Sequence, residues 1–307
     1  MTRAHLALLV AFASAPLIAQ PTAAPTVNSD RPILVEGYRT HAETIVRDTI
    51  KGAGVLPLAR FEDRICPGVV GLGSADANKL LQLIRDNVVS LGGRIAKPGC
   101  TANATVIFTP EPAGFVKKLA EKEPGYFAFS PAGIDQFTAK PRPVLSWHVN
   151  EVRDRDGNEL GNSRELGMAK QKILNQPAAA GAPMNARVLR NVGATHLYTN
   201  SREDMLFGFA VIDAAKIQGK TLEQLAAVAT LHLLLDIKQD GGTANPASIL
   251  SLFDERANSA ALPQGLSRFD QAMVQGLYEP KENNRSAAQQ FSQIATAIRR
   301  STPEGKD

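Results

Sequence analysis

The sequence contains little of what nucleic-acid binding or membrane spanning requires. Only 6% of its 307 residues are aromatic, and the formal net charge of +4 is spread out, with no run of five or six like charges. Base stacking needs aromatic side chains and phosphate binding needs clustered cations, so the composition argues against nucleic acid as a partner. No apolar run approaches the ~20 residues that cross a bilayer, so we expect no transmembrane helix.

Complete catalytic motifs are also missing. Neither the G-x-S-x-G elbow of hydrolases nor the S-x-x-K nucleophile of penicillin-binding proteins occurs. Gly71-Leu-Gly73-Ser74 precedes an expected helix, as a nucleotide-binding loop would, but Asp76 replaces the third glycine and no Walker lysine follows. A helix start explains these glycines, so the sequence predicts no cofactor and no metal.

The N-terminus has the order of a secretory signal peptide. A basic start, Met1-Thr2-Arg3, is followed by an apolar run over residues 6–13 and by small residues up to Ala19. We therefore expect residues 1–20 to be a signal peptide and residues 21–32, rich in Pro, Thr and Ala, to form a flexible leader. The protein is then periplasmic or secreted.

Cysteine is scarce, since the chain has only Cys66 and Cys100. An even number of cysteines in an exported chain favours one disulfide bond. The alternative, a nucleophile or a zinc ligand, lacks support because no histidine lies between the two thiols to complete a zinc spacing. We predict a Cys66–Cys100 disulfide.

Hydrophobic periodicity over residues 33–300 predicts a single α+β domain, with a mixed sheet packed with helices and a helical C-terminal third. We expect Ser74 to cap a helix that Gly92 ends. Residues 160–185 lack periodicity and mark a possible sub-boundary, and residues 301–307 are expected to be a disordered tail. The expected strands are 33–38, 104–108, 141–152, 186–191 and 205–213, and the expected helices are 41–51, 74–91, 111–121, 222–236, 266–278 and 284–300.

His232, on the expected helix 222–236, is one candidate for a functional residue. A zinc helix of the H-E-x-x-H type would need a second histidine four positions away, where the sequence has Val228 and Asp236. A hydrogen-bonded core histidine is therefore the favoured interpretation, and a ligand or base is the alternative.

Further candidates lie on or beside expected strands. His196 belongs to a polar stretch with Glu203 and Asp204, which would line a cleft or connect a hairpin. In the strand 141–152, alternation is expected to bury Trp147 and to leave His148 at the surface. A catalytic site would draw on His196, His232 and Glu203, with His148 and Asp204 as further members.

The segment 154–165 resembles a calcium loop in part. Oxygen-bearing side chains fall at the first, third, fifth, ninth and twelfth positions of the EF-hand pattern: Asp154, Asp156, Asn158, Asn162 and Glu165. The sixth position, however, holds a glutamate where that pattern needs glycine, and the preceding segment is an expected strand. A hairpin turn at Asp156-Gly157 is favoured, with a loose calcium site as the alternative.

Residues 248–278, SILSLFDERANSAALPQGLSRFDQAMVQGLY, resemble the ending of metzincin zinc proteases and of related uncharacterised exported bacterial proteins. Ser248-Ile249 corresponds to the turn under the metal, and residues 266–270 and 277–278 correspond to the start and end of the last family helix. The resemblance places the zinc helix at 222–236, with Ala226, Ala227 and Thr230 at positions that carry the ligands and the base. None of these three side chains can bind zinc or activate water.

The resemblance therefore implies a metal-free relative, an exported protein that binds an unknown partner or small ligand of the cell envelope through a protease-like cleft without catalysis. The alternative is a peptidase-like hydrolase whose site is assembled from the scattered His, Asp and Glu residues. A pair of histidines within about 4–5 Å of each other, beside a carboxylate in a concave pocket, would favour the hydrolase.

Overall fold

A computed structural model describes residues 32–52, 56–162, 187–188, 199–239, 247–255 and 262–301. The signal peptide, nearly all of the leader, most of the segment 160–185, His196 and residues 302–307 lie outside the described residues.

The core is a four-stranded sheet with the order β1-β2-β6-β3. β1 (Pro67–Val70), β2 (Ala104–Thr109) and β6 (Ser201–Asp213) are parallel, whereas β3 (Val144–Asp154) runs antiparallel to β6 and forms one edge. Two short strands, β4 (Gly161–Asn162) and β5 (Arg187–Val188), pair separately. The mixed sheet and its helices confirm the predicted α+β class.

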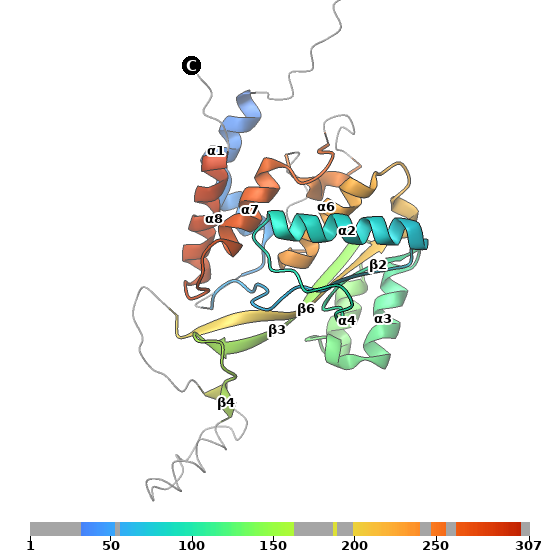
Figure 1. The fold of residues 1–307 in the computed structure, drawn as a ribbon, viewed down its shortest axis with the longest axis horizontal. Helices are drawn as coiled ribbons and strands as arrows, with labels where there is room; N and C mark the ends of the chain where they lie inside the picture. The colour runs from blue at the N-terminus through green and yellow to red at the C-terminus, as the bar shows by residue number, and fades with distance from the viewer. Residues whose placement is uncertain are drawn as a thin grey trace, which may run out of the picture.

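Helices cover both faces of the sheet (Figure 1). α2 (Ser74–Ser90) and α6 (Leu222–Leu234) lie on one face, and α3 (Pro112–Lys122) and α4 (Pro131–Thr138) lie on the other. Side chains alternate along β2 accordingly, since Val106 and Phe108 join the core under α6 while Ile107 joins the smaller core under α3. None of the described helices is long and apolar enough to cross a membrane.

Three helices pack together at one end of the sheet: α1 (Pro32–Thr49), α7 (Arg268–Tyr278) and α8 (Ala287–Ser301). Short 3-10 turns complete the fold at Pro124–Tyr126 (η1), Ala214–Lys216 (η2) and Ile249–Phe253 (η3). α6 begins with a capping box, in which the Thr221 hydroxyl accepts from the Gln224 amide and the Gln224 side chain accepts from the Thr221 amide.

The predicted disulfide is confirmed. Cys66 and Cys100 are bonded, with Cα atoms 6.1 Å apart. The bond joins the residue before β1 to the connection that follows α2, so it holds together the two chain segments on either side of that helix.

Several local expectations were wrong. Residues 33–38 lie in α1 rather than in a strand, because Pro32 suits the first turn of a helix and the helix continues to Thr49 against α8. Ser74 lies inside α2, and the residue before it, Gly73, takes the N-cap position without a side-chain cap. The helix does end at the expected place, where Gly92 has φ +87°. α4 was not expected, and only 187–188 of the strand 186–191 is described as strand.

Candidate functional site

A cleft of about 930 Å³ opens beside the first half of β3. It is bounded by α6, by the end of η3 and by the connections that precede α3 and follow α4. We call it the β3 cleft. Its volume lies in the range usual for ligand pockets. Its lining includes Val144, Leu145, Val228, His232 and Gln239.

The backbone of β3 has a free edge at this cleft. The carbonyl of Pro143 accepts from the amide of Asp213 in β6 (2.9 Å), so the alternate residues Val144 and Ser146 direct their backbone groups away from β6. The side-chain amide of Gln239 donates to the Ser146 carbonyl (2.8 Å) and occupies part of this edge. The amides of Val144 and Ser146 donate to no acceptor in the described part of the chain, and of these two residues Val144 lines the cleft whereas Ser146 is only 1% exposed. An extended peptide in the cleft can therefore pair with the backbone of β3 at Val144.

His232 forms part of the cleft wall with a fixed orientation. Its Nδ1 lies 2.8 Å from the hydroxyl of buried Ser146, and its Nε2 has no partner among the described residues. Burial, together with the nearby His148, lowers the pKa of His232 to about 3. The imidazole is therefore neutral at physiological pH and can hydrogen-bond a ligand through Nε2. The predicted hydrogen-bonded histidine is present, but it faces the cleft as well as the core.

Below pH 6.5, the wild-type protein should lose more stability than a His232→Asn variant. The folded state does not protonate His232 until about pH 3, whereas the unfolded chain takes up that proton near pH 6.5. The unfolded state then binds more protons, so acid favours unfolding. The free energy of unfolding of wild type, relative to that of His232→Asn, should therefore fall by up to about 1.4 kcal/mol per pH unit below 6.5.

Urea denaturation at a series of pH values measures this difference, and asparagine keeps a group that can bond Ser146. His41→Asn is the control, because His41 is exposed. Parallel pH curves for wild type and His232→Asn would contradict the expected linkage.

The sequence predicted His148 at the surface, and this prediction was wrong, because the residue is buried between β3 and α6. Alternation directs Trp147 into the smaller core and His148 to the opposite face, and helices cover both faces. The ring lies over Gly208, where a Cβ atom would be 3.1 Å from the ring and 3.2 Å from the carbonyl of Leu233. Nε2 of His148 donates to that carbonyl (2.9 Å), so this histidine anchors the end of α6 to β3.

Asp236 and Lys51 lie next to His148. Nδ1 of His148 is 3.8 Å from the Asp236 carboxylate, which Lys51 contacts at 2.9 Å. Burial alone would raise the pKa of Asp236, but His148 and Lys51 lower it. The carboxylate is therefore ionised and paired. Because the His148 side chain has no solvent exposure, this group does not present a base to a substrate.

The two acidic candidates lie outside the β3 cleft. Glu203 accepts from the side-chain amide of Asn150 (3.0 Å), and burial raises the pKa of the Glu203 carboxyl. Asp204 is buried and accepts from Arg202 (3.0 Å), and burial raises its pKa as well. Neither lines the cleft with His232. The structure therefore brings His148 near His232, but of the described candidates only His232 lines the concave pocket, and His196 lies outside the described residues.

The face of α6 that meets the cleft differs from the face that the metzincin resemblance had implied. Ala226, Ala227 and Thr230 are fully buried, and the Thr230 hydroxyl contacts Asn87 of α2. Val228 and His232, four residues apart on one side of the helix, line the cleft instead. A zinc helix would need two ligands at such a pair, and a valine side chain cannot bind zinc. Among the residues that the structure describes, no group of three or more His, Cys, Asp and Glu side chains could hold a metal ion.

The first half of the suspected calcium loop forms the predicted turn. Residues 155–156 turn the chain, and Gly157 has φ +91°. The carboxylate of Asp154 accepts from the amides of Asp156 (2.9 Å) and Asn158 (2.8 Å) and from the Asn158 side chain (3.0 Å). These bonds use its oxygens to stabilise the turn. The last expected ligand, Glu165, lies outside the described residues.

Sequence reasoning missed the parts of the site that depend on the edge position of β3. Ser146 and His148 alternate with apolar residues in the first half of β3, and this alternation was a signal that could have indicated a polar contact with α6. No local signal marked Gln239, which reaches the Ser146 carbonyl from a connection far along the chain.

No protein-family model, curated protein or solved structure matches this chain.

Proposed function

We propose that this protein is exported and binds an extended polypeptide segment of a partner in the β3 cleft without cleaving it. The observation that carries the proposal is the unpaired backbone edge at the start of β3, at Val144, inside a ligand-sized cleft. An extended peptide adds to such an edge through main-chain hydrogen bonds, while its side chains enter adjacent pockets. The amide of Val144 would donate to the peptide, and Nε2 of His232 would bond a polar group of it.

Two features support binding rather than hydrolysis. Proteolysis by a zinc helix needs paired ligands and a glutamate base, whereas the cleft-facing positions of α6 carry Val228 and one histidine, and residue 229 is alanine. Catalysis by a serine and a histidine would need an accessible hydroxyl, and Ser146 is only 1% exposed. The resemblance of residues 248–278 to metzincins fits this proposal if the chain keeps a protease-like cleft without the catalytic groups.

Selection of a random linear peptide library on the purified full-length protein tests the proposal. The best peptide should bind in fluorescence anisotropy, and mass spectrometry should find it intact after prolonged incubation. Val144→Pro removes one free-edge amide without removing a bond to β6, so it should weaken binding at least about tenfold. His232→Asn should weaken binding by about threefold to tenfold, because it removes Nε2 but keeps a partner for Ser146.

The control is His41→Asn, which should bind as wild type does because His41 is exposed on α1, away from the cleft. Cleavage of the selected peptide by wild type, lost in His232→Asn, would overturn the non-catalytic proposal. Peptides that bind Val144→Pro as tightly as wild type would overturn the proposed pairing with β3.

A further inference from the structure

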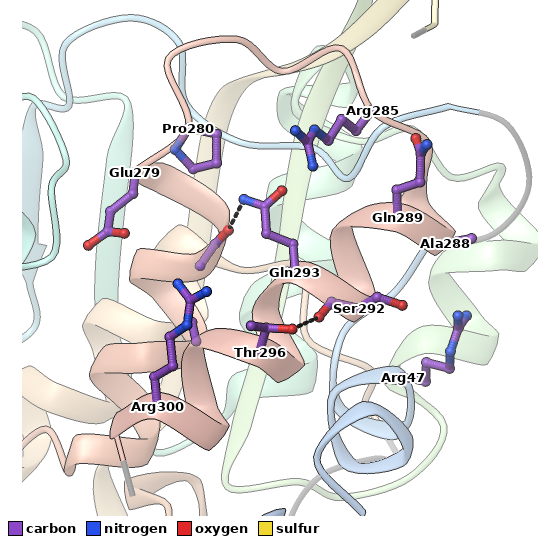
Figure 2. A pocket seen from close by; sticks show the side chains of 12 residues that line it. Arg47, Glu279, Pro280, Arg285, Ala288, Gln289, Ser292, Gln293, Thr296 and Arg300 are labelled. Atoms are coloured by element: carbon purple, nitrogen blue, oxygen red, sulfur yellow. Dashed lines mark hydrogen bonds between the residues drawn. The ribbon is translucent and has the colours of Figure 1, made fainter. Parts of the chain in front are cut away.

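A second hollow, of about 820 Å³, lies on the outer side of α8 (Figure 2). Its walls are α8, the end of α7 and the connection between these two helices. It shares no lining residue with the β3 cleft, and in Figure 1 α8 stands at the opposite end of the sheet from α3 and α4. We call it the α8 groove.

Close packing of two helices forms the floor of the α8 groove. A Cβ atom on Gly276 of α7 would lie 2.8 Å from the Cα atom of Ile294, so glycine is what allows α7 and α8 to approach this closely. The carbonyl of Gly276 accepts from the side-chain amide of Gln293 (2.9 Å), as Figure 2 shows. Gln293 is therefore held in place at the centre of the groove.

The charge of the α8 groove is positive. Arg285 and Arg300 line it, and Figure 2 shows both guanidinium groups directed toward the region around Gln293. Neither arginine forms an ion pair with any residue of the described part of the chain. A third arginine of the lining, Arg47, is already paired with Glu43 (2.7 Å). The lining has one carboxylate, Glu279. Because neither Arg285 nor Arg300 is in an ion pair with a described residue, their two guanidinium groups are available to an anionic ligand.

The polar side chains of the floor are suited to a peptide group. Nε2 of Gln293 donates to Gly276, which leaves its Oε1 as an acceptor. Oε1 of Gln289 accepts from the amide and hydroxyl of Ser286, which leaves its NH₂ group as a donor. A peptide unit offers one N–H and one C=O, and these match the acceptor and the donor. A simple anion has no N–H group to offer the oxygen of Gln293.

We infer that the α8 groove binds an acidic peptide segment of a partner protein, with carboxylates on Arg285 and Arg300 and a backbone peptide unit on Gln289 and Gln293. This interaction is separate from peptide binding at the β3 cleft and uses different residues. An arginine places two parallel N–H donors against a carboxylate, so the two guanidinium groups provide both attraction and orientation.

A fluorescein-labelled short peptide of alternating Glu and Gly is the probe, titrated with the full-length protein in fluorescence anisotropy. Arg285→Gln and Arg300→Gln should each weaken binding about tenfold, and the double variant should abolish measurable binding. The same peptide with Gln in place of Glu should bind at least about tenfold more weakly to wild type. Both arginines are exposed, so circular dichroism should show unchanged folding in the variants.

Arg299→Gln is the matched control, because Arg299 is an exposed arginine of the same helical turn that bonds Thr296 and does not line the groove. It should change the affinity less than about twofold. Equal binding of the Glu and Gln peptides, or unchanged binding by the double variant, would overturn the inference. Displacement of the peptide by equimolar inorganic phosphate would also overturn it. The same holds if the protein does not bind the peptide but binds anionic phospholipid vesicles in a way that requires both arginines. Val144→Pro should leave this binding intact, which separates this test from the test of the β3 cleft.

Discussion

Removal of the Cys66–Cys100 disulfide should lower the free energy of unfolding by about 4 kcal/mol. The bond closes a loop across a sequence separation of 34, and opening this loop gives the unfolded chain more conformational freedom. The folded state should change little, because α2 and β1 retain their packing on the rest of the core. Urea denaturation of a Cys66→Ala/Cys100→Ala variant measures the loss.

Wild-type protein under strong reductant is the control for the lost sulfur atoms. Cys66 is buried, so its replacement also removes some packing, whereas reduction removes only the cross-link. Reduced wild type should therefore be slightly more stable than the double variant and well below the oxidised protein. If reduction changed stability by less than about 1 kcal/mol, the loop-closure argument would be wrong for this chain.

Asp270→Ala should lower the free energy of unfolding by about 3–4 kcal/mol. Asp270 is fully buried, and its carboxylate accepts from the hydroxyl of Ser248 (2.5 Å) and the amide of Ile249 (3.0 Å) at the start of η3. It also accepts from the amide (3.0 Å) and hydroxyl (2.8 Å) of Ser267, which completes the capping box of α7. Alanine would leave these buried donors without an acceptor, so both the turn and the helix start would be destabilised.

Thermal and urea unfolding measure this effect, with Asp86→Ala as the control. Asp86 is exposed on α2 and accepts one bond from Gln82, so its loss should cost less than about 0.5 kcal/mol. Asp270→Asn should be intermediate, because the amide keeps one acceptor but directs N–H groups at other donors. Equal stability of Asp270→Ala and Asp86→Ala would show that the buried carboxylate does not connect η3 to α7.

The same aspartate illustrates how a sequence pattern and a tertiary contact can coincide. Ser267 and Asp270 have the spacing of a capping box, which is visible in the sequence, and residues 266–270 belong to the segment that resembles metzincins. The bond from Asp270 to Ser248 joins residues 22 positions apart and could not be derived from either segment alone. The proposed relation to protease-like clefts rests on this region, and the described residues lack the paired zinc ligands that such proteases use.

Buried arginine gives a second example of a contact without a local signal. Arg60 is only 3% exposed, and its guanidinium bonds Glu62 and donates to the carbonyls of Leu277, in the last turn of α7, and of Pro280, just after α7. In the sequence, Arg60 lies in an ordinary charged stretch. The carbonyls that it satisfies come from a distant helix end, and only the folded chain brings them together.

The elements with strong local signals were determined by the sequence itself. The apolar period of α2, the β-branched run of β2 and the capping box of α6 depend on neighbours a few residues apart, so their existence follows from nearby residues. The disulfide followed from the number of cysteines and the expected export. For the helices and the strand, the deciding interactions join residues a few positions apart. For the disulfide, each cysteine has only one other cysteine with which it can pair.

The position of the candidate sites was decided by the tertiary structure. Whether β3 is an edge strand depends on its pairing with β6, about sixty residues away in the chain. Because α6 is apolar on nearly every side, its sequence could not indicate that Val228 and His232 face a cleft while Ala226 and Thr230 face the core. The groove that Arg285 and Arg300 line likewise depends on a tertiary contact, since its floor is the close approach of α7 and α8 at Gly276. Strand order and helix face are set by packing between distant segments, and local propensity carries no information about them.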